Sequence, residues 1–443
     1  MTPTAPTPRR LPPREPPPSA RRPRPATERV RGTDVSETRR FESLWNDLHP
    51  VGRDGGSGGY RRFAWTREDA TLREWFVGEC AALGLDVTED RAGNQWAWWG
   101  NPDDAPGEGV VTGSHLDSVP DGGAFDGPLG VVSSLLAVKA LQEKGFAPRK
   151  PIGVVNFVDE EGARFGVACA GSRIITGALD ADRARSLTDA DGVTMAEAWQ
   201  RAGRDPGTLG RDDETLARVG TFVELHVEQG RALIDLDDAP VAIGTDIWPH
   251  GRFRADLPGR ADHAGTTALG NRDDALLKAA QFIEATRGAA ARVTARARAA
   301  TASSPPSASS TWCREASMPS RRTSRRGWTH EAPGRRTCGP SSASSRSAPG
   351  HLGGSWRAES WTPTTPFDAG LVEQLDATLS GVPLLGTGAG HDAGILANHG
   401  VPTAMLFVRN PTGTSHSPEE FAETDDCVRG VEALVRVLED LAG

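Results

Sequence analysis

The sequence predicts an α/β fold: a central sheet covered by helices, with a smaller α+β domain inserted into the main one. Short apolar runs of strand length alternate with helical stretches through the first half of the chain. The pattern changes after Gly230, and strand-like runs return near the C-terminus. At 443 residues the chain is also too long for one ordinary core, so we expect two folding units.

The N-terminal segment, residues 1–40, is rich in proline and arginine and almost lacks aliphatic side chains. It cannot bury enough apolar surface to offset the entropy of ordering, so we expect it to be disordered. Because patterned sequence starts only near Phe41, we expect translation to begin downstream of Met1. The segment from Thr66 to Gly84 follows, with an N-cap residue, acidic residues in its first turn and one apolar face. It predicts an amphipathic helix.

The main domain is expected to begin with residues 41–233. Helical stretches separate its apolar runs, which is typical of a sheet covered on both faces. These runs predict strands at 95–99, 110–112, 152–158 and 222–227.

The inserted domain is expected at residues 234–358, with a strand at 252–259 and a helix at 271–286. The main domain then resumes over residues 359–443. Its predicted elements are strands at 382–385 and 403–408 and a C-terminal helix with Val428, Val431, Val435, Leu438 and Leu441 on one side.

Residues 293–358 are anomalous. Ser, Arg, Pro, Thr and Gly dominate them, and neither a period of 2 nor one of 3.6 is present. A disordered loop is one interpretation, but a loop of this length is uncommon inside a compact domain. We favour the hypothesis that two compensating frameshifts alter this part of the gene. Lysine occurs only at positions 139, 144, 150 and 278 in an arginine-rich chain, as expected of a GC-rich gene.

Composition excludes several classes of function. The net charge of -9 and the pI near 5.7 argue against a nucleic-acid-binding face, so the expected partner is a small molecule. The five cysteines are scattered and form no CxxC pair, which suits a reducing cytoplasm better than a disulfide framework. No apolar run reaches the length of a membrane span, so we expect no membrane partner.

The segment VVTGSHLDSVPDGGAFDGPLGVV carries the first chemical motif. A buried strand delivers His115 and Asp117, and a glycine-rich loop then delivers Asp126 ahead of a helix. Folds present ligands in this way at the carboxyl edge of a sheet. A lone histidine in such a strand is more often structural, but this spacing favours a metal site. Asp117 can accept the second imidazole N–H and fix the tautomer, while Asp126 can bridge two ions.

The segment PIGVVNFVDEEG runs from an apolar strand into Asp159, Glu160 and Glu161. Adjacent carboxylates repel one another unless a cation lies between them. A solvated turn is the alternative interpretation. Because the run follows a buried strand in a chain that already offers His and Asp ligands, we favour the metal site.

The segment TFVELHVEQG puts Glu224, His226 and Glu228 on one side of a strand. His226 is either a salt-bridged surface residue or a ligand, and the first two motifs favour a ligand. In NPTGTSHSPEEF, His416 stands directly before a segment with the N-cap, N1 and N3 residues of a capped helix, Glu420 being N3.

Together these residues provide three histidines, an aspartate, a glutamate and a spare glutamate. That set of side chains suits the ligands of two divalent cations, Mn or Zn, with one bridging carboxylate. The sequence contains no GxSxG elbow, no P-loop and no GxGxxG after a strand, so serine-nucleophile and nucleotide-binding functions have little support.

Six motifs in order, GSHLDSVPDGGAFDGPLGV, DEEGARFG, ELHVEQG, DHAGTT, GAGHDA and SHSPEEF, resemble the carbamoylase and allantoate amidohydrolase branch of the aminoacylase- and carboxypeptidase-like metallohydrolases. The resemblance covers about residues 41–292 and 359–443. It implies a mixed-sheet, metallopeptidase-like catalytic domain with an inserted lid and dimerisation domain, and a homodimer if the lid is intact.

The resemblance also implies site roles. Glu160 becomes the general base, which takes a proton from the attacking water and hands it to the leaving nitrogen. One metal ion is held by His115, Asp126 and His226, and the other by Asp126, Glu161 and His416.

His263 in DHAGTT resembles the lid histidine that polarises the scissile carbonyl, often from the neighbouring subunit; a capping or surface histidine is the alternative. Gln229 resembles a substrate contact, and the loop with Gly388, Gly390 and His391 is implied to line the same pocket. The family also holds the substrate carboxylate with an asparagine and an arginine of the lid. Both belong in residues 293–358, where neither is recognisable.

The leading hypothesis is hydrolysis of allantoate, since SHLDSVPDGGAFDG and DIWPHGRFR are closer to the allantoate enzymes. N-carbamoyl-L-amino-acid hydrolase or beta-ureidopropionase is the near alternative, and a dinuclear exopeptidase is a further, disfavoured one. A hypothesis of another class is a metal-binding protein without turnover because of its damaged lid.

Overall fold

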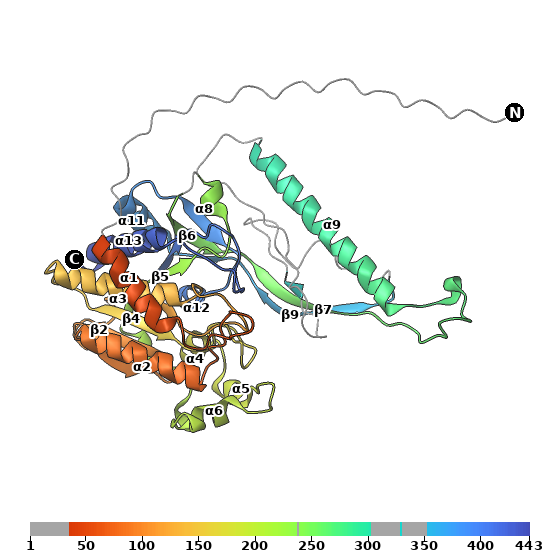
Figure 1. Cartoon of the computed structure of the whole chain (residues 1–443), viewed down its shortest axis with the longest axis horizontal. Helices are drawn as coiled ribbons and strands as arrows, with labels where there is room; N and C mark the ends of the chain where they lie inside the picture. The colour runs from red at the N-terminus through yellow and green to blue at the C-terminus, as the bar shows by residue number, and fades with distance from the viewer. Residues whose placement is uncertain (1–34, 237–238, 303–327, 330–351) are drawn as a thin grey trace, which may run out of the picture.

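The computed structural model describes residues 35–236, 239–302, 328–329 and 352–443, and its main feature is a mixed sheet of nine strands (Figure 1). The strand order is β1-β2-β4-β3-β5-β12-β6-β10, and β11 pairs with β6. The central strands β4, β3, β5 and β12 are parallel, whereas β2 and β6 pair antiparallel at their flanks. The strands are β1 Asp86–Glu89, β2 Gln95–Trp99, β3 Gly109–His115, β4 Ile152–Phe157, β5 Val219–Val227, β6 Val241–Ile247, β10 Thr365–Pro366, β11 Leu384–Thr387 and β12 Thr403–Val408.

Helices cover both faces of this sheet, and each face has its own hydrophobic core. In β12, Leu406 and Val408 belong to one core, whereas Met405 and Phe407 belong to the other, as the period of two requires. The first core includes α1 Val35–Leu48, α2 Arg67–Ala82, α3 Pro128–Glu143, α11 Ala369–Leu379 and α13 Thr424–Ala442. The second includes α4 Ala170–Ile175, α5 Ala181–Ser186, α6 Met195–Arg201, α7 Asp213–Leu216, α8 Ala232–Asp235 and α12 Asp392–His399.

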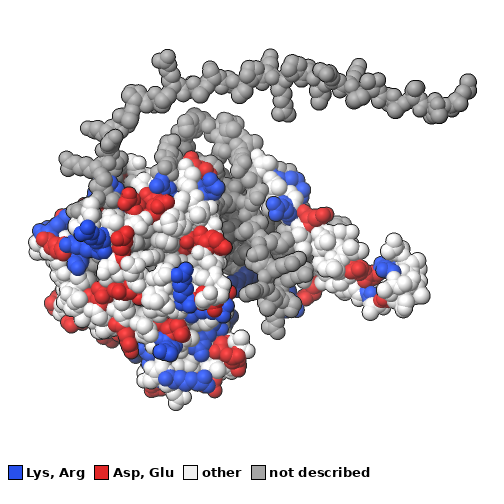
Figure 2. Space-filling view, in the orientation of Figure 1, with Lys and Arg blue, Asp and Glu red and all other residues white. Residues whose placement is uncertain are grey.

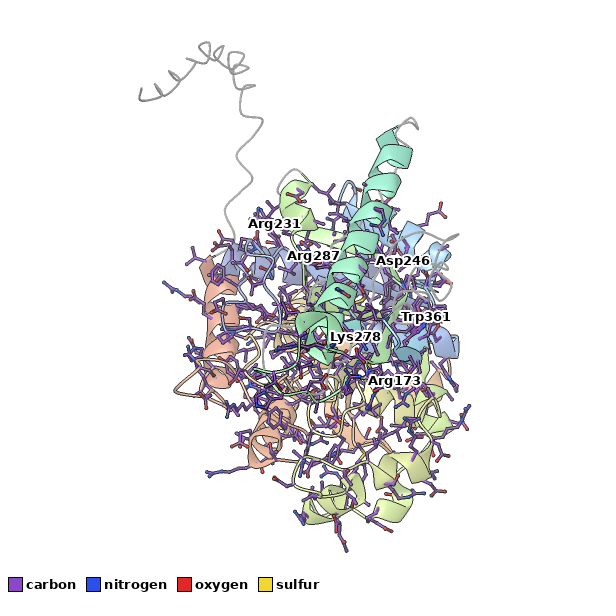
Figure 3. All side chains as sticks on the ribbon, turned by 90° about the vertical axis from the view of Figure 1, so that its right-hand side faces the viewer. Arg173, Arg231, Asp246, Lys278, Arg287 and Trp361 are labelled. Carbon is purple, nitrogen blue, oxygen red and sulfur yellow. The ribbon has the colours of Figure 1, made fainter. Side chains whose placement is uncertain are left out.

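A second, three-stranded sheet stands apart from the first and has the order β8-β7-β9 within the described part of the chain. Its strands are β7 His250–Asp256, β8 Trp328–Thr329 and β9 Ser355–Thr362. With helix α9, Ala275–Ala302, it forms an arm that projects from the main body, to the right in Figure 1. Figure 3 views the molecule from this arm. It labels Lys278, Arg287 and Trp361 on the arm, and Arg173, Arg231 and Asp246 on the main body.

The sequence predicts most of these elements correctly, including α2 with its N-cap Thr66, strands β2 to β5, β11, β12 and α13. The N-terminal boundary was wrong, because α1 begins at Val35, inside the segment expected to be disordered. It is held by the buried Phe41 and by the ion pair from Arg40 to Glu143. The remainder of that segment, residues 1–34, lies outside the described residues.

The inserted segment also differs from expectation. Strand β6 pairs with β12 in the large sheet, so the part that stands apart begins at β7 and not at residue 234. Helix α9 continues beyond the predicted end at 286 because Ala and Arg, both strong helix formers, fill the next turns. Strand β9 likewise starts inside the anomalous residues 293–358, since it pairs with β7. The frameshift hypothesis itself concerns mostly residues 303–327 and 330–351, which lie outside the described residues.

Candidate metal centre

The topology brings the predicted ligands to one edge of the large sheet. His115 is the last residue of β3, Glu160 and Glu161 follow β4, and His226 lies near the end of β5. Strands β4, β3 and β5 are parallel neighbours, so their carboxyl ends meet at this edge. Strand β12 lies parallel to β5, and the loop after it carries His416.

His115, Asp126 and His226 form a first cluster, in which the candidate ligand atoms all lie within 4.8 Å of one another. Oδ1 of Asp126 is 3.2 Å from Nε2 of His226 and 3.7 Å from Nε2 of His115. All three side chains are buried. This is the triad predicted for one cation.

Asp126, Glu161 and His416 form a second cluster with the same spacing. Here the other oxygen of Asp126, Oδ2, is 3.3 Å from Nε2 of His416, which is 3.6 Å from Oε2 of Glu161. The two oxygens of one aspartate therefore face different clusters, which is the geometry of a bridging carboxylate.

The donor atoms fit two divalent cations. Nε2 of His115 and Nε2 of His226 are buried, and neither makes a hydrogen bond within the described part of the chain. A buried imidazole nitrogen without a partner is costly, and a metal ion removes that cost. The mixed imidazole and carboxylate set suits borderline divalent ions.

The pKa values of the carboxylates reflect this crowding. The pKa of Asp126 lies well below its usual range. Burial by itself would raise this pKa, but the nearby imidazoles of His226 and His416 have the larger, opposite effect. Burial, followed by the charge of Asp126, raises the pKa of Glu161 to about 7. The raised pKa of Glu161 shows that negative charge in this site is not compensated by the protein groups around it. A bound cation would compensate that charge.

Glu160 lies beside the first cluster, with Oε2 3.8 Å from Nε2 of His115. The thiol of Cys169 donates a hydrogen bond of 3.4 Å to Oε1 of Glu160. Burial, aided by Glu161 and opposed by His115, raises the pKa of Glu160 well above its usual range. A carboxyl with a raised pKa beside a metal site is suited to move protons near neutral pH.

Asp117 ties the first two motifs together. Its Oδ1 lies 3.4 Å from Nδ1 of His115, while the hydrogen bond of that nitrogen, 3.2 Å long, is made with the backbone carbonyl oxygen of Asp117. Its two oxygens also accept hydrogen bonds of 3.1 Å from the backbone N–H groups of Glu160 and Glu161. The backbone of Asp117 therefore orients a predicted ligand, and its carboxylate holds the loop that carries the candidate base.

Of the predicted substrate contacts, Gln229 and His391 lie beside the clusters. Nε2 of Gln229 donates to Oδ2 of Asp126 at 2.8 Å. The ring of His391 is buried, with its centroid 4.5 Å from that of His226. Gly388 and Gly390 belong to the same loop as His391, between β11 and α12.

His263 is the predicted site residue that the structure does not bring to the clusters. It is exposed on the loop between β7 and α9, which Figure 1 shows at the far end of the arm. Its Nδ1 accepts hydrogen bonds from the backbone N–H groups of Gly265 at 3.1 Å and Thr266 at 3.0 Å. Within one chain it therefore organises a turn of the arm.

The segment after His416 corrects a prediction. Residues 417–420 form a turn instead of the start of a helix, and α13 begins only at Thr424. Glu420 therefore is not the N3 residue of a helix, and its carboxylate instead accepts hydrogen bonds from the residues that precede α3. Neither this contact nor that of Cys169 has a signal in the sequence, because each joins loops whose proximity only the fold creates.

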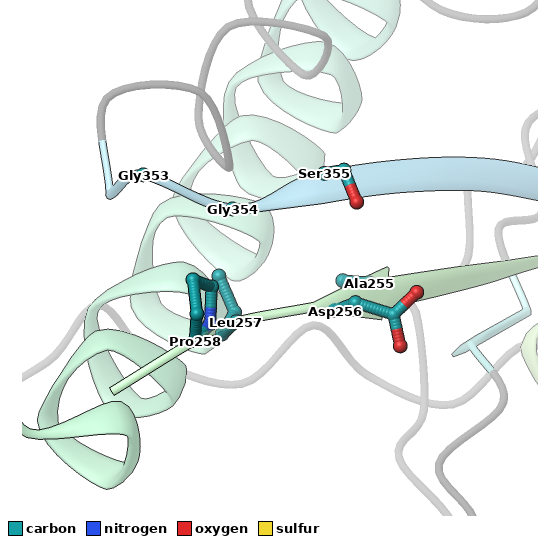
Figure 4. A pocket seen from close by; sticks show the side chains of 7 residues that line it. All are labelled: Ala255, Asp256, Leu257, Pro258, Gly353, Gly354 and Ser355. Carbon is teal, nitrogen blue, oxygen red and sulfur yellow. The ribbon is translucent and has the colours of Figure 1, made fainter. Parts of the chain in front are cut away.

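Within the described residues, neither the face in Figure 2 nor the pocket in Figure 4 gathers a second group of candidate metal ligands. Acidic and basic side chains are interspersed over the main body in the view of Figure 2. The pocket in Figure 4 lies between the end of β7 and the start of β9, on the arm. It offers one carboxylate and no histidine, and its lining residues are Ala255, Asp256, Leu257, Pro258, Gly353, Gly354 and Ser355.

No helix within the described ranges has both the length and the apolar character needed to cross a membrane.

Comparison with known proteins places these motifs in context. Residues 111–440 match the model of Peptidase family M20/M25/M40. The chain is 32% identical to an N-carbamoyl-L-amino acid amidohydrolase of Geobacillus stearothermophilus, with 90% of this chain and 98% of the relative covered. It is 28% identical to an allantoate amidohydrolase of Escherichia coli (strain K12), with 87% and 94% covered. A hydantoinase/carbamoylase family amidase from Burkholderia ambifaria has a similar structure, with a TM-score of 0.69, 30% identity and 93% and 98% covered.

Proposed function

Because the chain belongs to Peptidase family M20/M25/M40, in the branch of the hydantoinase/carbamoylase amidases and allantoate amidohydrolases, we propose that its substrate is allantoate or a close ureido acid. The chain is a metal-dependent amidohydrolase of carbamoyl or ureido compounds. The observation that supports two-metal chemistry is the position of Asp126, whose two oxygens face two separate clusters of candidate ligands.

The proposed ligands are those predicted from the sequence. His115, Asp126 and His226 hold one divalent cation, and Asp126, Glu161 and His416 hold the other. When bound, manganese or zinc ions supply Lewis acidity: they polarise the scissile carbonyl and make a water molecule more acidic.

Glu160 moves the proton in the proposed reaction. Its Oε2 faces the first cluster, so this atom is placed to take a proton from the attacking water. The same oxygen then delivers the proton to the leaving nitrogen, which departs as an amine. The hydrogen bond from Cys169 occupies Oε1, and burial excludes bulk water from the transfer.

Substrate binding is proposed to involve Gln229, Gly388, Gly390 and His391 on the main body. His263 completes the site from the arm of a second copy, because its loop, between β7 and α9, lies at the far end of the arm in its own chain (Figure 1). We accordingly propose a homodimer. In each subunit, the main domain comprises the large sheet and its helices, and the inserted domain extends from β7 to β9.

N-carbamoyl-L-amino acids are the second candidate substrates, because the Geobacillus relative of that name aligns over almost its whole length. A panel containing allantoate, N-carbamoyl-L-amino acids and 3-ureidopropionate separates the candidates. Ammonia arises from all of them, so the carbon product must be identified by mass spectrometry. We expect turnover of allantoate with added manganese, and turnover at least about 100-fold slower by the Glu160→Gln variant.

Turnover of only the carbamoyl amino acids would reassign the substrate. If the protein binds two cations but turns over none of these compounds, the result supports the other hypothesis, a metal-binding protein that lacks activity because its lid is damaged.

A further inference from the structure

Glu420 joins two loops that are far apart in the sequence. Its Oε1 accepts hydrogen bonds from the backbone N–H of Phe125 at 2.8 Å and from that of Asp126 at 2.9 Å. The Glu420 side chain is buried, with 4% of the residue exposed. Two hydrogen bonds to one buried acceptor oxygen fix the positions of both amides, and both amides lose their partner if that oxygen is removed.

Each of these two loops carries a proposed ligand. Asp126 lies on the first loop, and His416 lies four residues before Glu420 on the second. The backbone N–H of Glu420 also donates to the carbonyl of Ser417 at 3.0 Å, which closes the turn that follows His416. Through Glu420, the backbone of Asp126 is therefore fixed relative to the loop that carries the His416 ring.

The packing around Glu420 shows that the space for it is specific. A Cβ atom at Gly123 would lie 2.4 Å from both Cβ and Oε1 of Glu420, so only glycine admits the carboxylate there. Next to it, the rings of Phe125 and Phe421 meet edge to face with centroids 6.1 Å apart. The two loops are thus held by apolar contact as well as by hydrogen bonds.

We propose that Glu420 is a positioning residue that holds the bridging Asp126 at the distance from His416 needed for both cations. This inference rests on the metal centre proposed above, and it concerns a residue that belongs to neither of the two proposed ligand sets. Removal of Glu420 leaves two buried N–H groups without an acceptor and frees Asp126 to move relative to His416.

The test compares Glu420→Ala with Glu420→Gln, because glutamine keeps an acceptor oxygen but not the charge. Glu419→Ala is the matched control, since Glu419 is the exposed neighbour in the same turn. Metal-free protein is titrated with Mn²⁺ or Zn²⁺ in a calorimeter, and its fold is checked by circular dichroism. We expect Glu420→Ala to lose about 10- to 100-fold in affinity for at least one cation. Glu420→Gln and the control should stay close to the wild type.

Hydrogen exchange of the metal-free variants gives a second readout. The Phe125 and Asp126 amides should exchange faster in Glu420→Ala but not in Glu420→Gln or Glu419→Ala. Wild-type affinity for both cations in Glu420→Ala overturns the proposal, as does an equal loss in Glu420→Gln. A wild-type chain that binds no cation overturns the metal centre itself, and the exchange data then still report whether Glu420 fastens the two loops.

Discussion

Gly127 offers a sharp test of the metal centre, because it lies directly behind a proposed ligand. A Cβ atom there would be 2.4 Å from Cε1 and 2.5 Å from Nδ1 of His115. Ordinary contact starts near 3.4 Å, so the Gly127→Ala variant must displace the buried ring by about 1 Å. Ligand distances in metal sites tolerate only about 0.2 Å. We therefore expect affinity for the cation at His115 to fall.

Backbone strain accompanies this displacement. Gly127 has φ 87° and ψ -61°, a combination that an alanine adopts only with strain of about 1–3 kcal/mol. Gly145 serves as the control, since it also has a positive φ, of 71°, but nothing lies within 4 Å of a Cβ placed there. The Gly145→Ala variant should lose about 1–2 kcal/mol of unfolding free energy and keep its metal affinity.

Two measurements separate these effects. Urea unfolding of the metal-free proteins reports the loss of stability, and calorimetric titration with Mn²⁺ or Zn²⁺ reports the affinity for each cation. We expect only Gly127→Ala to lose affinity, by about 10-fold or more. If Gly127→Ala binds two cations as tightly as Gly145→Ala does, His115 is not a ligand in the arrangement proposed here.

Three further predictions concern the site. The Glu160→Gln variant should bind both cations normally but lose about 10²–10⁴-fold in kcat, and an unchanged kcat would remove its role as the base. Chelation should abolish activity and lower the free energy of unfolding by about 2.7 kcal/mol per cation lost, when the free metal had been 100-fold above its Kd. Calorimetric scans before chelation, after it and after metal is restored measure this change. The His263→Ala variant should lose about 10²–10³-fold in kcat and keep both cations. If His263 of one subunit completes the active site of the other, refolding a mixture of His263→Ala and Glu160→Gln chains should give more activity than either variant has alone.

Local patterns in the sequence determined the secondary structure of the main domain. The N-cap Thr66 and the apolar face behind it predict α2, and the apolar run before Asp159 predicts β4. Such signals are local because capping and burial periodicity depend on neighbouring residues. The same sequence identified the chemical inventory, since His115 and Asp126 stand at strand and loop ends where ligands are presented.

Tertiary structure alone decided how these residues meet. The order of strands β4, β3, β5 and β12 places the ligand-bearing ends side by side, and no local pattern encodes that order. The sequence therefore did not reveal that Glu420 holds the backbone of Asp126, or that the arm carries His263 away from its own clusters. Local chemistry selects which residues can bind a cation, but contacts between remote segments fix the distances at which they do so.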